Sequence, residues 1–166
     1  MSRDVGNSLI FNAARKPGET KIIDFVAIFN EKPTMTVCVC ATIDEDGTPH
    51  TAPVNLIVAK DDRTLLIGLL EGNVTTMNIR RSAFACLEAF GPDDLAVGIK
   101  GNVRIVKEPM DCNSSMIVGE MTVEAVKQDT SPAQVVTAGT SAQPRSDRGR
   151  AFAESAIEEL RKIAGV

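Results

Sequence analysis

The sequence has no cluster of basic residues, and this absence argues against a nucleic-acid surface. It carries 18 Lys and Arg against 22 Asp and Glu, for a formal net charge of −4. Neutralising the phosphates of a nucleic acid requires cations that are grouped on one face. The only arginine-dense stretch, residues 145–150, is interrupted by acidic and small residues, so we interpret it as a solvated loop. No nucleic-acid partner is expected.

Histidine is nearly absent, and the cysteines are not paired in metal-binding motifs. The one histidine is His50, and none of the four cysteines belongs to a CxxC unit: Cys38, Cys40, Cys86 and Cys112. Structural zinc sites draw their ligands from such units, so no metal site is predicted. Cys38 and Cys40 face the same side of one strand as a possible redox pair, but their parallel Cβ vectors disfavour a disulfide. We expect buried thiols.

Long apolar runs are also missing. No stretch approaches the roughly 20 apolar residues that a transmembrane helix needs. The first 20 residues lack the basic start, apolar block and cleavage site of a secretory signal. These absences predict a soluble, cytoplasmic protein that does not bind a membrane. The 166 residues, 43% of them hydrophobic and 24% charged, suit one globular domain over residues 1–166.

What the sequence does contain is a series of short apolar runs separated by turn residues. They predict six strands at about residues 34–43, 49–60, 65–70, 83–90, 95–108 and 116–128. Periodicity predicts a helix over Glu19–Asn30 capped by Thr20, two helical turns within residues 74–82, and an amphipathic helix over residues 149–165. Short connections make neighbouring strands antiparallel, so the fold is a closed or partly closed barrel.

The predicted barrel has two distinct parts of the chain around it. Its core occupies about residues 34–128, and an extended arm followed by the C-terminal helix occupies about residues 129–166. Gly98 and Gly101 interrupt the fifth strand, where glycine indicates a bulge, a bend or the close approach of another backbone.

Two motifs in a fixed order carry more information than the periodicity. Residues 41–49 read A-T-I-D-E-D-G-T-P, and residues 99–103 read I-K-G-N-V. Over roughly Phe25 to Lys107 this order resembles the pyridoxamine 5'-phosphate oxidase-like family of FMN-binding split barrels. The resemblance implies a mainly β fold, a six-stranded antiparallel split β-barrel with peripheral helices. It also implies a homodimer that holds FMN at the subunit interface.

The resemblance implies a cofactor site made from two segments. In the family, the strand after the first motif lines the flavin, which would place Pro53, Val54 and Asn55 beside the ring or the ribityl chain. The start of the short helix after the third strand holds the phosphate. Here that segment is Gly72, Asn73, Val74, Thr75 and Thr76.

The phosphate segment departs from the family because many relatives carry Lys or Arg there and this chain does not. Backbone N–H groups at a helix start, with the threonine hydroxyls, can still bind an anion. Arg80 and Arg81 lie a turn or more further along. The alternative for Asn73, Thr75 and Thr76 is ordinary helix capping.

Other polar residues have structural and functional interpretations. Asn55 suits either a hydrogen bond to the flavin edge or a bond to barrel backbone. His50 is a candidate proton donor, although an exposed strand position is favoured. Lys100 and Arg104 are expected to be solvated charges. No catalytic residue is identified, because a flavin carries its own redox chemistry.

Three functions remain open on the sequence. The first is an FMN-dependent oxidoreductase with a small-molecule redox substrate. The second is a non-catalytic flavin- or haem-binding electron carrier, and the third is an F420-dependent reductase, whose cofactor tail would need a more basic groove. Oxidation of pyridoxamine phosphate itself is disfavoured, because Arg145, Arg148 and Arg150 do not match the basic pattern that binds the substrate phosphate in relatives.

Overall fold

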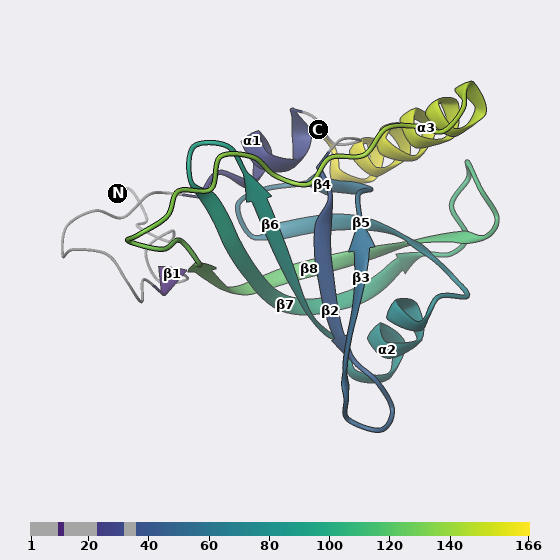
Figure 1. Ribbon diagram of the computed structural model, residues 1–166. Coiled ribbons are helices and arrows are strands. Elements are labelled where there is room, and N and C mark those ends of the chain that lie inside the picture. Colours follow the sequence, from purple (N-terminus) through teal and green to yellow (C-terminus); the bar gives the residue numbers. More distant parts are fainter. Residues whose placement is uncertain (1–9, 12–22, 32–35) are drawn as a thin grey trace, which may run out of the picture.

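The computed structural model describes residues 10–11, 23–31 and 36–166. Its strands are β1 Ile10–Phe11, β2 Cys38–Ile43, β3 Pro49–Val54, β4 Ile57–Ala59, β5 Thr64–Leu70, β6 Phe84–Gly91, β7 Leu95–Lys107 and β8 Met116–Gln128. Its helices are α1 Phe25–Asn30, α2 Val74–Ser82 and α3 Asp147–Ala164. Seven strands form a curled antiparallel half-barrel in the order β3-β2-β6-β7-β8-β5-β4, and β1 pairs in parallel with β8 (Figure 1).

The predicted mainly β, antiparallel barrel class is confirmed, but the strand count of six is wrong. The expected second strand is interrupted at Asn55 and Leu56 and forms β3 and β4 instead. These two short strands lie at opposite ends of the sheet order, so the Asn55–Leu56 link joins the two edges of the curled sheet. The Leu56 carbonyl accepts a hydrogen bond from Gly68 N at 2.8 Å, which holds the link against β5.

The N-terminal helix is shorter than the sequence suggests. Its predicted cap, Thr20, lies outside the described residues. The described helix begins at Phe25, after Asp24, whose carboxylate accepts a hydrogen bond from Ala27 N at 3.0 Å. A carboxylate in this capping position fixes the helix start. The side chain of Asn30 then bonds both N and O of Ala59, each at 2.8 Å, and this clamps α1 to β4.

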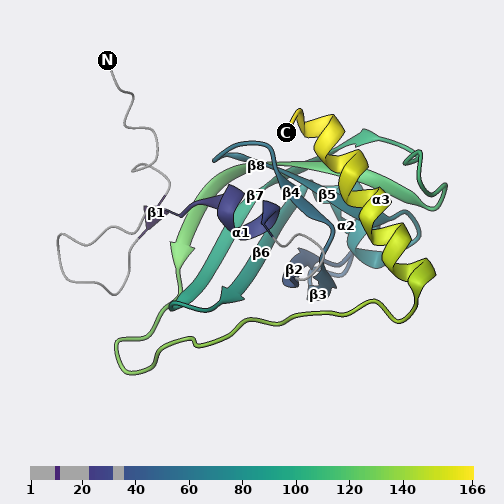
Figure 2. The same cartoon turned by 90° about the horizontal axis from the view of Figure 1, so that it is seen from above.

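The C-terminal helix packs on its own chain. Ser146 caps it by accepting a hydrogen bond from Gly149 N at 3.1 Å, and it ends at Gly165, whose φ of 77° suits glycine. Its buried side chains, including Ile157 and Leu160, cover β4 and β5. Figure 2 shows the extended arm, residues 129–146, running along the molecule to the start of α3. Of the arginine-dense stretch, residues 145–150, only Arg145 and Ser146 lie in a loop. Residues 147–150 form the first turn of α3, so the loop interpretation is wrong for them.

Two of the four cysteines are buried as predicted, whereas Cys86 and Cys112 are only partly buried. Cys38 and Cys40 are buried at 0% and 1% exposure in the barrel core, and all four cysteines are free. Burial raises the pKa of Cys38 to about 12 and that of Cys40 to about 11. Since the thiolate is the reactive form, these two thiols are inert core residues.

A buried carboxylate holds α3 to the loop between β7 and β8. Glu159 is 8% exposed and accepts hydrogen bonds from Asp111 N at 2.8 Å and Cys112 N at 3.0 Å, and Lys107 Nζ lies 2.9 Å away. Burial alone would raise the pKa of Glu159, but the bonds from Lys107 and the two N–H groups outweigh it and lower this pKa to about 2.

Replacing Glu159 by glutamine is expected to lower the free energy of unfolding by about 2 kcal/mol at pH 7. The folded-state pKa lies below the ordinary value of 4.5, so the ionised carboxylate contributes its full stabilisation at pH values above 4.5. This stabilisation is lost as the pH falls from 4.5 toward the folded-state pKa of about 2. Urea unfolding followed by circular dichroism should therefore show a smaller difference from the parent at pH 3. Glu158→Gln, at an exposed position of the same helix, is the control. An equal loss at both pH values would contradict this account.

Candidate functional site

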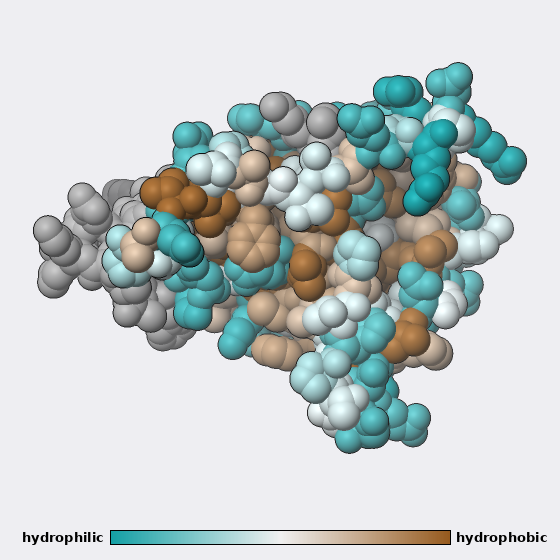
Figure 3. Space-filling view, viewed as in Figure 1, coloured by the Kyte–Doolittle hydropathy of each residue, from teal (hydrophilic) through white to brown (hydrophobic). Residues whose placement is uncertain are grey.

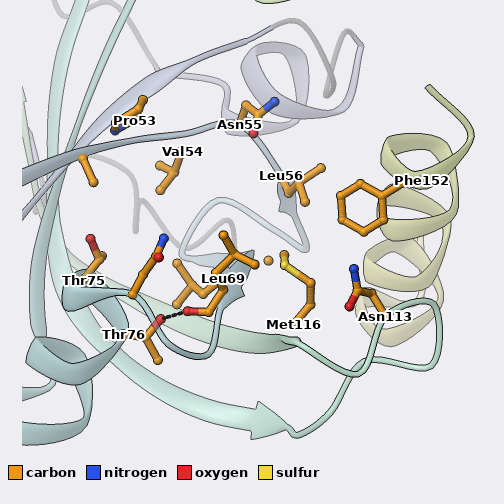
Figure 4. Close-up of a pocket in the computed structure, with 14 residues that line it drawn as sticks. Pro53, Val54, Asn55, Leu56, Leu69, Thr75, Thr76, Asn113, Met116 and Phe152 are labelled. Carbon is orange, nitrogen blue, oxygen red and sulfur yellow. Dashed lines mark hydrogen bonds between the residues drawn. The ribbon is translucent and has the colours of Figure 1, made fainter. Parts of the chain in front are cut away.

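Six of the eight predicted site residues surround one cavity. The cavity has a volume of about 270 Å³ and lies between the start of α2 and the side of α3 (Figure 4). The residues that line it among those predicted are Pro53, Val54, Asn55, Asn73, Thr75 and Thr76. Gly72 and Val74 are exposed and do not line it. The structure therefore brings together the two segments that were separate in the sequence.

The rest of the wall comes from residues that the sequence did not indicate. Leu69 comes from β5, Met116 from β8, Asn113 from the loop before β8, and Phe152 from α3. Figure 4 shows Phe152 and Asn113 on the side of the cavity opposite Thr75 and Thr76. The sequence pattern placed Phe152 on the apolar face of the C-terminal helix, which predicted a packing role and not a position in a cavity wall. We call the end formed by Asn73, Thr75 and Thr76 the polar end. Asn113 adds a polar group on the opposite side, and Leu69 and Met116 lie between the two (Figure 4).

The start of α2 leaves hydrogen-bond donors free at the polar end. The first backbone bond of the helix runs from Met77 N to Asn73 O at 3.0 Å, so the N–H groups of residues 74–76 have no acceptor within the helix. Asn73 occupies the capping position, but its side chain makes no capping bond. Ordinary capping therefore does not account for Asn73.

The two threonines differ in what their hydroxyls do. Thr76 is fully buried and donates to Leu70 O at 2.7 Å, which ties the helix start to the end of β5. Thr75 is 3% exposed, and its hydroxyl lies 3.3 Å from Nε2 of His50. Thr76 thus has a structural role, whereas the partner of Thr75 is an ionisable group.

His50 is not the exposed strand residue that the sequence favoured. Its side chain is 25% exposed, because it pairs with Thr42 across β2 and β3 on the side where α2 packs. Its Nδ1 lies 3.9 Å from Oδ1 of Asp44. Asn78, buried in α2, donates to that same oxygen at 2.6 Å and to Thr42 at 3.0 Å. A polar network therefore leads from Asn78 through Asp44 and His50 to the cavity wall at Thr75.

The arginines of α2 are directed away from the cavity. Arg80 and Arg81 lie in the last turn, where Arg80 pairs with Glu108 and Arg81 donates to the carbonyl of Ile43. None of the residues that line the cavity carries a charge. The predicted lack of a cation at the helix start thus holds for the part of the chain that the structure describes.

Lys100 and Arg104 of β7 lie in solvent, unlike Lys107 at the end of the strand, which pairs with Glu159. Lys100 is exposed, and so is Arg104, which pairs with Glu120 at 2.6 Å. Both were predicted as solvated charges, and this is confirmed.

A second, larger cavity of about 530 Å³ lies between α1, the β6–β7 turn and the arm. Its wall contains Asp24, Glu31 and Asp93 and, among the described residues, no Lys, Arg or His. This negative wall is unsuited to a phosphate group, since like charges repel. The smaller cavity at α2 is therefore the candidate anion site.

The outward side of β3, β2 and β6 is apolar and exposed. Its members that are 39–42% exposed are Val39, Ile43, Phe84 and Phe90. We call these four residues, with the exposed Pro53, the outer face (Figure 3). Glu88 faces the same side between Val39 and Gly98, and burial and the nearby Asp129 raise its pKa to about 6. Pro53 belongs to both the outer face and the cavity wall.

Among residues 10–11, 23–31 and 36–166, no helix combines the length and hydrophobicity that spanning a lipid bilayer requires. Within those same residues, no group of three or more His, Cys, Asp or Glu side chains is placed to hold a metal ion.

Comparison with known proteins gives a family and a fold. Residues 25–164 match the family model described as pyridoxamine 5'-phosphate oxidase. The fold is similar to that of a putative pyridoxamine 5'-phosphate oxidase from Lactobacillus delbrueckii, at 20% identity and a TM-score of 0.53, covering 68% of this chain and 98% of that one. It is also similar to HupZ from Group A Streptococcus, at 18% identity and a TM-score of 0.54, covering 71% and 95%.

The fold is similar to that of a third solved structure, an F420 reductase, at 15% identity and a TM-score of 0.52, covering 61% of this chain and 96% of that one. No curated protein matches the sequence.

Proposed function

The chain belongs to the pyridoxamine 5'-phosphate oxidase family, and from this premise we propose that it is an FMN-binding flavoprotein. In this proposal it is a homodimeric, FMN-dependent oxidoreductase that acts on a small redox substrate in the cytoplasm. The observation that carries the proposal is the cavity at the start of α2, because it unites the two segments that the family resemblance assigned to the cofactor.

The cavity fits FMN in its chemistry. Its apolar walls, with Val54, Leu69 and Met116, suit a flat ring system, and its polar end offers free N–H groups at a helix start. A helix N-terminus carries a partial positive charge and favours a phosphate even without a lysine. Asn55 and Asn73 add amide groups that can donate to or accept from the ring and the ribityl chain.

The size of the cavity supports a shared site. At about 270 Å³ it lies just below the usual range for ligand pockets, which is roughly 300–1,000 Å³. One chain therefore encloses only part of a flavin nucleotide, and a second chain would supply the remaining wall. The outer face supports this arrangement because it reaches the rim of the cavity at Pro53.

In such a mechanism the residues of this chain would bind the flavin, orient its ring and exclude water. When bound, FMN supplies the electron and hydride transfer itself. The helix start of α2 would bind the phosphate, Pro53 and Val54 would fix the face of the ring, and Phe152 would exclude water from one side. Among the residues that the structure describes, no ionisable side chain lines the cavity, and this favours a second candidate, a flavoprotein that carries electrons without turnover.

The test is to titrate the purified full chain with FMN, record the absorption spectrum, and measure the mass of the coloured species by light scattering after gel filtration. We expect one FMN per chain on a dimer. A chain that binds no FMN, or a monomer that binds it fully, would contradict the proposal. Parallel titrations with F420 and haem separate the alternatives: tighter binding of either would replace FMN as the cofactor.

Turnover distinguishes the enzyme from the carrier. The FMN-loaded dimer is expected to oxidise NADH or NADPH in the presence of an electron acceptor, or to reduce oxygen with a bound substrate. Reduction of the flavin by dithionite without either activity would leave the carrier as the function.

A further inference from the structure

The phosphate end of the cavity has an unusual donor set. Of the two threonine hydroxyls there, the Thr76 hydroxyl is already used, because it donates to Leu70 O. The Thr75 hydroxyl remains, and its partner is a ring nitrogen of His50, which can act as donor or acceptor. We propose that His50 provides the positive charge of the phosphate site through Thr75, so that binding of FMN there is accompanied by the uptake of a proton by His50. This inference rests on the proposed function.

The direction of one hydrogen bond decides whether Thr75 can bind an anion. In the neutral tautomer that carries its proton on Nδ1, on the side of Asp44, Nε2 of His50 accepts a hydrogen bond from the Thr75 hydroxyl, which then presents only oxygen lone pairs to the cavity. When His50 carries a second proton, Nε2–H donates to the Thr75 oxygen, and the hydroxyl hydrogen becomes free to bond a phosphate oxygen. Protonation of His50 therefore changes Thr75 from an acceptor into a donor and adds a charge behind it.

Asp44 lies beside the other ring nitrogen of His50. Its Oδ1 lies 3.9 Å from Nδ1 of the ring, on the side away from Thr75. This carboxylate is held in place by Asn78, which donates to it at 2.6 Å. The network thus holds the ring between an anion of the protein and the expected position of an anionic ligand.

The other charged groups near His50 do not take this role. The charged residues of α2 and of the turn between β2 and β3 are Asp44, Glu45, Asp46, Arg80 and Arg81, and β2 itself adds only the buried thiols Cys38 and Cys40. Of these, Asp44 is the residue whose charged atoms lie within 4 Å of the ring. Arg80 and Arg81 are engaged with Glu108 and the Ile43 carbonyl at the far end of α2. Within the described residues, His50 is thus the group best placed to supply the positive charge that Lys or Arg supplies in many relatives.

The experiment compares FMN with riboflavin, which lacks the phosphate. Calorimetric titrations of the full chain at pH 7.5, in two buffers of different ionisation enthalpy, measure the protons taken up on binding. At this pH the FMN phosphate is already mostly dianionic, so the uptake belongs to the protein. We expect roughly half a proton or more per FMN, and none per riboflavin.

Substitutions at His50 and Thr75 test whether the proton that is taken up on FMN binding is bound by His50. His50→Gln and Thr75→Val should each abolish the proton uptake and weaken FMN binding about tenfold or more. Both should leave riboflavin affinity unchanged, and the double variant should be no weaker than either single one. Thr75→Ser, which keeps the hydroxyl, should retain the uptake. Thermal unfolding of each variant without ligand shows whether it is folded.

The outcomes separate the two proposals. If the parent protein binds FMN but takes up no proton, or if His50→Gln takes up as many protons as the parent, His50 does not serve the phosphate and the FMN assignment stands. If the parent binds neither FMN nor riboflavin, the proposed function fails and this inference fails with it.

Discussion

Gly101→Ala is expected to leave the protein unfolded or in insoluble form. A Cβ atom at this position would lie 2.9 Å from the carbonyl carbon of Thr122 in β8 and closer still to its oxygen. Gly101 sits at a register shift between β7 and β8, where the backbones approach closely. Because β8 is bonded on its other side to β5, it cannot easily move away. We expect a cost of about 4 kcal/mol or more, a large share of a typical folding free energy.

A matched glycine separates this steric effect from a general effect of losing glycine. Gly149 lies in α3, where an added Cβ would meet only Ser146 Oγ at 3.5 Å, an ordinary contact. Gly149→Ala should therefore stabilise the protein by roughly 0.5–1 kcal/mol. Soluble yield and urea unfolding compare the two variants. A Gly101→Ala protein as stable as the parent would show that the bulge relaxes around a methyl group.

Gly101 also shows what a sequence pattern can and cannot specify. Two glycines within an apolar strand predicted a bulge, a bend or a close approach, and the structure has a register shift together with a close approach at Gly101. At Gly98 the added atom would instead meet the carboxylates of Glu88 and Asp129, each at 3.1 Å. The choice among these causes depends on which strand lies opposite, and this is set by pairing distant in sequence.

The split between β3 and β4 was missed for a related reason. Residues 49–60 form a run without glycine, and their only polar interruption in the second half is Asn55. Pro53 is a local sign of an edge strand, and β3 is one, but no local pattern shows that the chain then crosses to pair with β5 at the opposite edge of the sheet. The barrel class was predictable because it depends on the alternation of strands and turns, whereas the closing link depends on tertiary pairing.

The candidate site also has parts that the sequence could predict and parts that it could not. Its local segments, Pro53 to Asn55 and the start of α2, could be named from the resemblance because each is continuous in sequence. Phe152 reaches the cavity from a helix that follows an 18-residue arm, residues 129–146, and no local pattern indicates this contact. His50 was misjudged because its contact with Thr75 depends on α2 packing under β2 and β3.

A single charge in the outer face is expected to dissociate the proposed dimer and remove most of its FMN affinity. Val39 is 42% exposed, and it pairs with Pro53 of β3 and Glu88 of β6 on the same side of the sheet. In a two-fold dimer, Val39→Asp introduces the charge twice. Burying an unpaired carboxylate costs several kcal/mol, so we expect dimer affinity to fall at least about 100-fold.

Val26→Asp is the matched control, since Val26 on α1 is similarly exposed at 46% but does not belong to the outer face. Sedimentation equilibrium and FMN titration of both variants measure assembly and binding. If FMN lies at the interface, the two properties of Val39→Asp fall together, because a monomer retains only the part of the site that its own cavity encloses. A monomeric Val39→Asp protein with full FMN affinity would place the complete site in one chain. A stable dimer would show that the outer face is not the interface.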